Sequence, residues 1–168
     1  MQGQSCSVNG VGVEGLAGVA GAIPIVAKGA ASQSANLMEF EKSCGAALSV
    51  FNKSGWLGIG AKSAPTTLHV NGSLSAKTVK VSKNYTMTKT DFAVLASGAI
   101  TVTLPAAKTS AGMIVFIKNV NTSATTVTVK PAGSDNIDNS TAAQSLSAVN
   151  SKISLVSDGT TNWYVLST

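Results

Sequence analysis

Very few residues of this chain have the types and spacing that enzyme chemistry needs. His69 is the only histidine, and it lies between Leu68 and Val70 in a stretch whose alternation predicts a strand. A serine hydrolase would need this imidazole beside an activated nucleophile, and no Gly-x-Ser-x-Gly turn occurs. We therefore interpret His69 as a residue of a strand face or of a subunit axis, without a catalytic role.

The seven acidic residues are a second possible source of chemistry. A glycosidase needs two carboxyl groups on either side of its substrate. Glu39 and Glu41 share a face if the backbone is extended, but so do alternate residues of any solvated strand. Asp135 and Asp138 lie in a predicted loop that could hold a cation, although Asp is common in turns because it hydrogen-bonds the local backbone. The sequence therefore predicts no enzyme.

A resident metal or cofactor is not expected either. Cys6 and Cys44 are far apart and lack a Cys-x-x-Cys spacing, so with one histidine they form no recognisable metal-ligand set. Buried free thiols are the preferred interpretation, and a disulfide is the alternative. Gly58-Ile59-Gly60 lacks the spacing and the strand–turn–helix context of a nucleotide-binding fingerprint.

The positive charge does not have the form that nucleic-acid binding needs. The net charge of +5 is the difference between 12 basic and seven acidic residues, and all of the basic residues are lysine. Arginine supplies the planar fork that grips phosphate, and nucleic-acid binders concentrate their basic residues on one face. Here the densest group is Lys77, Lys80 and Lys83. We predict no nucleic-acid partner. We expect the lysines either to form a weakly basic surface or to face acidic groups of a protein partner.

Trp163 and Tyr164 are the candidates for a contact with glycans. Aromatic residues make up 5% of the chain, and these two are neighbours in a predicted strand. Neighbouring side chains of a strand point to opposite faces. At most one of the two can therefore face a ligand while the other packs in the core.

Residues 1–30 are predicted to form an extended, glycine-rich arm. The apolar run 11–27 contains Glu14, Pro24 and several glycines, whereas a membrane span needs about 20 continuous apolar residues. The uncharged first residues do not fit a signal peptide. Because the arm lacks side-chain bulk, we expect it to bury itself against other chains; insertion into a membrane is the alternative. Its contact residues would be Val11, Val13, Leu16, Val19, Ile23, Pro24, Ile25 and Val26.

Residues 31–62 are predicted to form short strands joined by a turn. Apolar residues alternate over 48–51 and 56–60, and Asn52-Lys53-Ser54-Gly55 has the composition of a turn. A helix over residues 36–47 is the alternative, because Asn36 can cap it with Glu39 three positions later. Two such strands are marginally stable alone in water.

Residues 63–168 are predicted to form a separate antiparallel β-sandwich, so the expected class is all-β. Alternation is strict over 100–104 and 126–130, whereas 113–117 is apolar on both faces and indicates a central strand or one covered by a neighbouring subunit. The candidate strands recur about every ten residues, which is typical of sandwiches. They are 67–70, 78–81, 85–87, 92–95, 100–104, 113–118, 126–131, 144–146, 152–157 and 162–166.

Two parts of the chain resemble virion proteins of tailed bacteriophages. Residues 36–60, followed by Leu68-His69-Val70-Asn71-Gly72, are similar to the shaft segments of fibre and capsid-decoration proteins. The C-terminal module of many fibre proteins resembles YTMTKTDFAVLASGAITVTLPAA (85–107), GMIVFIKNV (112–120), VTVKPAGSDNID (127–138) and SLVSDGTTNWYVL (154–166). The resemblance implies an obligate homotrimer, whose short β-shafts meet at a threefold axis in a core of Leu48, Val50, Trp56, Leu57 and Ile59.

The resemblance implies a structural virion protein with one of two roles. A decoration, or cement, protein binds at threefold positions of the capsid and clamps neighbouring copies of the major capsid protein. A short tail fibre, or receptor-binding protein, contacts host surface glycans instead. An arm and shaft of residues 1–62 before a module of residues 63–168 give little reach, which favours decoration on the outer capsid surface over attachment to the tail. A small carbohydrate-binding module without a virion role is the third hypothesis.

Overall fold

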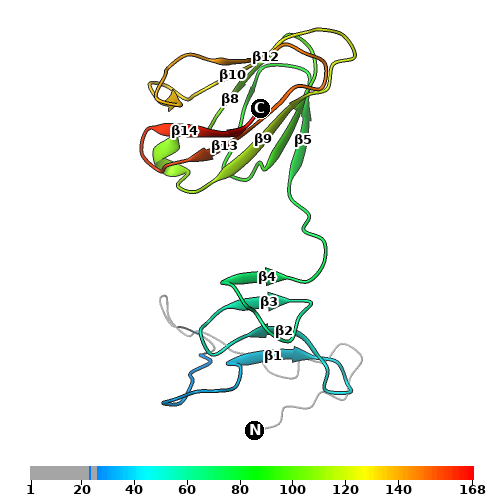
Figure 1. Cartoon of the computed structure of the whole chain (residues 1–168), viewed down its shortest axis with the longest axis vertical. Helices are drawn as coiled ribbons and strands as arrows, with labels where there is room; N and C mark the ends of the chain where they lie inside the picture. Colours follow the sequence, from blue (N-terminus) through cyan, green and yellow to red (C-terminus); the bar gives the residue numbers. More distant parts are fainter. Residues whose placement is uncertain (1–22, 24–25) are drawn as a thin grey trace. The chain divides into compact units, whose positions relative to one another are not determined.

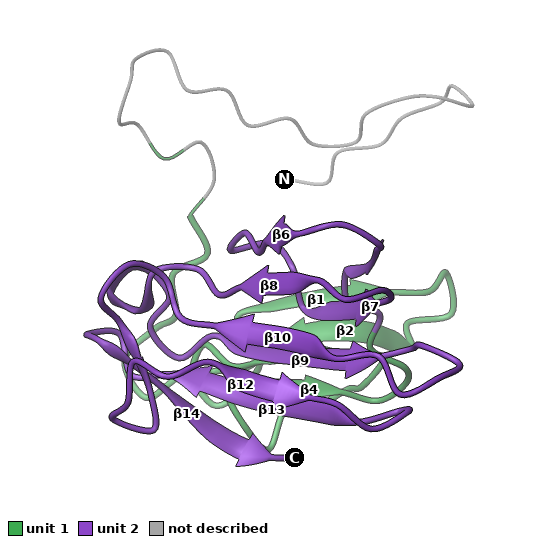
Figure 2. Ribbon diagram, turned by 90° about the horizontal axis from the view of Figure 1, so that it is seen from above, with its two compact units in different colours: residues 1–74 green, residues 75–168 purple. Residues whose placement is uncertain are grey.

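The structure is a computed structural model that describes residue 23 and residues 26–168, arranged in two compact units (Figures 1 and 2). The first unit is Met1–Leu74 and the second is Ser75–Thr168. The boundary lies beyond the predicted position at 62/63, because the strand at residues 68–70 pairs within the first unit. The described residues are all-β apart from one short 3₁₀ turn, as expected.

The first unit contains one four-stranded sheet, in the order β1-β2-β3-β4. Its strands are β1 (Met38–Glu41), β2 (Ala47–Phe51), β3 (Leu57–Ile59) and β4 (Leu68–Val70). β1, β2 and β3 pair antiparallel as successive hairpins, and β4 returns to pair parallel with β3. The alternative of a helix over residues 36–47 is wrong, because β1 and the turn that follows occupy this segment.

The two hairpins of this sheet have turns of the same form, ten residues apart. Lys42 donates its N–H to the carbonyl of Ala46, and Asn52 donates to Trp56 in the same way. Each turn contains a glycine at positive φ, Gly45 at 77° and Gly55 at 75°, a conformation that costs most other residues energy. These turns set the register of β1, β2 and β3.

The second unit folds as two facing sheets, one in the order β12-β10-β8-β6 and the other in the order β11-β14-β13-β9-β7-β5 (Figure 1). The 3₁₀ turn η1 (Ala107–Thr109) follows β8. The strands are β5 (Thr78–Val81), β6 (Tyr85–Thr86), β7 (Ala93–Ala96), β8 (Thr101–Thr103), β9 (Ile114–Asn119), β10 (Val127–Lys130), β11 (Asn136–Ile137), β12 (Gln144–Leu146), β13 (Lys152–Ser157) and β14 (Asn162–Ser167).

The prediction of an antiparallel sandwich is wrong in its strand directions. From β5 to β10 the chain passes alternately from one sheet to the other, so each sheet receives every second strand. The neighbours β5, β7 and β9 therefore run parallel, and so do β6, β8 and β10. Antiparallel pairing returns where β12, β13 and β14 complete the two sheets.

One hydrophobic core lies between the two sheets of the second unit. Strict alternation in β8 and β10 points Val102, Val127 and Val129 inward, where they are completely buried. They pack in one cluster with Val115 and Ile117 of β9, which has a neighbour on each side as its apolar sequence predicts. Burial of such side chains stabilises a fold by about 2 kcal/mol each, before the entropy of ordering them is counted.

Candidate functional site

The first unit exposes one apolar face of its sheet. Residues that pair across neighbouring strands lie on the same face. One row across the sheet is Met38, Phe51, Leu57 and Leu68, and the next row is Phe40, Ser49, Ile59 and Val70. We call the seven apolar residues of these rows the apolar face. Phe40 keeps 51% of its surface exposed and Leu68 keeps 56%, although strands usually bury such residues.

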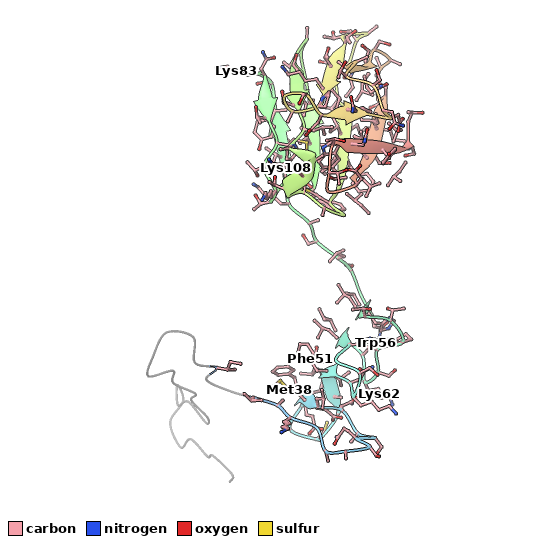
Figure 3. All side chains as sticks on the ribbon, turned by 90° about the vertical axis from the view of Figure 1, so that its left-hand side faces the viewer. Met38, Phe51, Trp56, Lys62, Lys83 and Lys108 are labelled. Atoms are coloured by element: carbon pink, nitrogen blue, oxygen red, sulfur yellow. The ribbon has the colours of Figure 1, made fainter. Side chains whose placement is uncertain are left out.

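The opposite face of this sheet is covered by its own chain. The side-chain amide nitrogen of Asn52 donates to the carbonyl of Ala64 at 3.1 Å. This hydrogen bond holds residues 61–66 over β2 and β3. Val50 is 0% exposed beneath this segment, and a Cβ on Gly58 would lie 3.0 Å from the carbonyl oxygen of Ser63. Figure 3 shows Met38 and Phe51 on one side of the sheet and Lys62, in the covering segment, on the other.

The structure divides the five residues predicted for the trimer core. Leu57 and Ile59 lie on the apolar face. Val50 points to the covered face and is already buried within one chain, so the prediction for Val50 is wrong. Leu48 is exposed on the same side of the sheet as Val50. Trp56 is exposed at the hairpin turn, where its backbone N–H donates to the side-chain oxygen of Asn52 at 3.0 Å.

Most residues of the apolar face are not among those predicted from the sequence. The predicted residues come from one hairpin, whereas the face combines the alternation of four strands. The signal was present, because Met38 and Phe40 alternate with Glu39 and Glu41, and Leu68 and Val70 flank His69. Pairing these strands in register would have placed them beside Phe51 and Ile59.

The first unit has too little core of its own to stabilise four short strands. Among its described residues, Val50 and Ala64 are the only buried apolar side chains. A small sheet needs a hydrophobic face packed against another layer to be stable in water. The apolar face is the surface of this unit that is available to form such a layer.

The residues predicted for the arm lie mostly outside the described part of the chain. This holds for Val11, Val13, Leu16, Val19, Pro24 and Ile25. Ile23 and Val26 are described, and both are exposed.

The predicted glycan contact is corrected at Trp163. Its side chain is completely buried in the core, where the indole N–H donates to the carbonyl of Pro105 at 3.1 Å. A side chain without exposed surface cannot contact a glycan. Tyr164 is 39% exposed on the outer face, so the expectation that the two side chains point to opposite faces is confirmed.

The residues considered for catalysis or metal binding either accept hydrogen bonds from the backbone or lie apart from one another. Asp135 accepts the N–H of Ala107 at 2.8 Å, and Asp138 accepts that of Val165 at 3.0 Å. His69 pairs with Gly58 in the first sheet. Within the described residues no group of three or more His, Cys, Asp or Glu side chains could hold a metal ion. Cys44 is free, but it lies exposed in a turn and not buried as predicted.

Comparison with known proteins does not assign the chain to a family. No protein-family model matches the sequence, and no match is found among curated proteins. Within the part of the chain that the structure describes, no helix is long and apolar enough to cross a membrane.

Proposed function

We propose that the protein is a structural, self-associating virion protein: a homotrimeric decoration protein that binds the capsid at threefold positions. The observation that carries the proposal is the apolar face of the first unit, which is exposed while the unit's own core holds two apolar side chains. The trimeric state and the virion role come from the resemblance to phage fibre and decoration proteins.

Self-association supplies the missing layer of the first unit. Met38, Phe40, Phe51, Ile59 and Leu68 are each more than a third exposed. Burying the remaining surface of each would contribute about 1 kcal/mol, or roughly 5 kcal/mol per chain, before the cost of association. Three copies around an axis would bury three such faces. The charged residues Glu39 and Glu41 of β1 would stay outside this core, because they alternate with Met38 and Phe40.

The arm is proposed as the contact with the major capsid protein. Its apolar residues carry little bulk, and three arms on one trimer would bind cooperatively through their high effective concentration. A weak contact per arm then suffices for stable attachment. The second unit would face outward, so the protein would lie on the outer surface of the capsid.

The oligomeric state tests the core of the proposal. We expect light scattering of the purified full chain to give three times the chain mass of 16.8 kDa. Phe40→Glu places a charge in the apolar face and should yield monomers. Leu48→Glu is the matched control, because Leu48 is an exposed apolar residue of the same sheet on the other face, and this variant should stay trimeric. A monomeric wild type would contradict the proposal.

The location in the virion is tested separately. Antibodies against residues 75–168 should label the head of intact particles in immunogold electron microscopy. Labelling confined to the tail would instead support the short tail-fibre alternative. Deleting residues 1–30 should abolish attachment to the particle and leave residues 75–168 folded, and retained attachment would contradict the role of the arm.

A further inference from the structure

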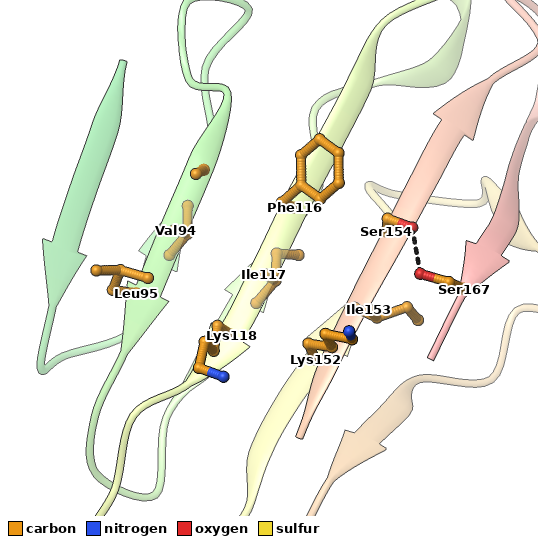
Figure 4. Close-up of a pocket in the computed structure, with 10 residues that line it drawn as sticks. Val94, Leu95, Phe116, Ile117, Lys118, Lys152, Ile153, Ser154 and Ser167 are labelled. Atoms are coloured by element: carbon orange, nitrogen blue, oxygen red, sulfur yellow. Dashed lines mark hydrogen bonds between the residues drawn. The ribbon is translucent and has the colours of Figure 1, made fainter. Parts of the chain in front are cut away.

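The outer face of the larger sheet in the second unit carries a hollow. Its volume is ≈ 260 Å³, which suits a group of the size of one sugar ring. It lies over the middle strands β7, β9 and β13 and the end of β14 (Figure 4). The residues that line it are Ala93, Val94, Leu95, Phe116, Ile117, Lys118, Lys152, Ile153, Ser154 and Ser167.

Two lysines lie opposite each other at one end of the hollow. Lys118 of β9 and Lys152 of β13 are register partners, and Figure 4 shows their side chains next to each other. Like charges directly opposite on paired strands destabilise a sheet. The Lys118 ammonium donates to the carbonyl of Asn150 at 3.3 Å. The one ion pair among the described residues is elsewhere, between Lys77 and Asp91, so no carboxylate of the described chain neutralises the two lysines.

The rest of the hollow has a different character. Phe116 follows in the next row of the face, 43% exposed, and its ring is supported by Phe92 with ring centroids 5.0 Å apart. Ser154 of β13 is the register partner of Phe116, and its hydroxyl is hydrogen-bonded to that of Ser167 of β14 at 2.9 Å. Ser154 is only 5% exposed and Ser167 is exposed, so the hollow places positive charge, an aromatic wall and one accessible hydroxyl within one small surface.

We infer that this hollow binds an anionic saccharide. A carboxylate or sulfate on the sugar would bind between Lys118 and Lys152, and so relieve their repulsion. The C–H groups of one face of the sugar ring would pack on Phe116, and a sugar hydroxyl would hydrogen-bond to the exposed hydroxyl of Ser167, which Ser154 holds in place. This inference goes beyond the proposed capsid role and holds wherever the protein sits in a particle.

The charge of the hollow favours an anionic saccharide over a second copy of the chain and over nucleic acid. A second copy docked face to face would bring another pair of lysines toward the first. Nucleic acid would require a basic surface extending well beyond the hollow. Lys80 is the nearest further lysine on this face, and Leu95 lies between it and Lys118 in the register.

A glycan array probed with the full chain tests the inference. We expect binding to sialylated, uronic-acid or sulfated glycans and not to their neutral counterparts. Replacing both lysines, as Lys118→Gln with Lys152→Gln, should weaken binding at least about tenfold, since each lysine contributes a charge-assisted contact. Phe116→Ala should weaken binding to the same acidic glycans while leaving the net charge unchanged.

Lys130→Gln together with Lys108→Gln is the matched control, because it removes the same charge away from the hollow. Binding by this control should equal that of the wild type, and an equal loss would reduce the effect to non-specific attraction. Binding of neutral glycans alone, or of none, would overturn the inference. So would a change in the oligomeric mass of the Lys118/Lys152 variant, because the face would then be an interface between copies.

Discussion

The ammonium of Lys77 lies 2.7 Å from one carboxylate oxygen of Asp91, a residue that is itself buried. The other oxygen accepts hydrogen bonds from the Tyr85 hydroxyl at 2.9 Å and from the Thr88 N–H at 2.7 Å. The pair joins the start of β5 to the segment between β6 and β7. Lys77 precedes β5 of the larger sheet, whereas Tyr85 lies in β6 of the smaller sheet, so Asp91 links the two layers of the second unit at one end.

We expect Asp91 to make the stability of the second unit depend on pH. Burial raises the pKa of this carboxyl, but the Lys77 ammonium and the donors of Thr88 and Tyr85 outweigh burial and lower the pKa from 3.8 to about 2. A carboxyl whose pKa is lowered by folding stabilises the folded state at pH values above its pKa in the unfolded chain. This stabilisation is lost as the pH falls from about 4 to about 2. Urea unfolding between pH 2 and pH 7 measures this loss.

Asp91→Asn isolates the contribution of this carboxylate. The variant should be less stable at pH 7 by about 1–3 kcal/mol, and the difference from the wild type should shrink below pH 4. The comparison is needed because Asp158, held by the hydroxyl and N–H of Thr160, also has a pKa below its usual range. A difference that stays constant down to pH 2 would contradict the role of Asp91.

Asn119 should tolerate neither loss nor reversal of its hydrogen bonds. Its buried amide nitrogen donates to the carbonyls of Thr125 and Leu146 at 2.7 and 2.8 Å, and its oxygen accepts the N–H of Asn121 at 2.9 Å. Asn119→Asp keeps the shape but removes the donors, so a charge would face two carbonyls. We expect a loss of at least about 2 kcal/mol in urea unfolding. Ser145→Ala, at an exposed position of β12, should change the stability little.

The two tryptophans should report on different environments. Trp163 is buried and Trp56 is partly exposed. Acrylamide should therefore quench the fluorescence of Trp163→Phe, which retains Trp56, more strongly than that of Trp56→Phe. Trp163→Phe should also cost about 2–4 kcal/mol of stability, because it leaves a void and an unpaired carbonyl at Pro105. Equal quenching of the two variants would contradict the burial of Trp163.

Gly58→Ala tests the segment that covers the first sheet. The added methyl group would lie 3.0 Å from the Ser63 carbonyl and 3.2 Å from a methyl group of Val50, so residues 61–66 must move away. We expect faster amide hydrogen exchange at Leu57, whose N–H donates to the carbonyl of Thr67 directly after this segment. Gly45→Ala is the control: its positive φ costs about 1 kcal/mol, but no atom lies within 4 Å of the added group. Exchange that is unchanged in Gly58→Ala would contradict the close contact.

The strands of the second unit were predictable because their alternation and turns are local properties. The ranges 78–81, 144–146 and 152–157 agree with β5, β12 and β13. β11 was missed, since two residues carry no period. Strand direction was not predictable, because a ten-residue spacing is the same whether the chain turns back in one sheet or crosses to the other. Likewise, alternation placed Trp163 and Tyr164 on opposite faces but left open which face the core would take.

The candidate surfaces were harder to predict than the strands. The apolar face depends on the register of four strands, and the choice of Val50 failed because a segment more than ten residues away folds over it. The lysine pair of the hollow comes from strands more than thirty residues apart in the sequence, so no local motif announces it.

Residues 61–66 cover just one face of the first sheet, and this would limit how many copies could join in the proposed assembly. A sheet with two adhesive faces can stack without end, layer upon layer, as in a fibril. Here residues 61–66 occupy one face, so each copy offers a single adhesive side. In the proposed assembly those sides would be turned toward a common centre, and association would then end at a closed oligomer of defined size.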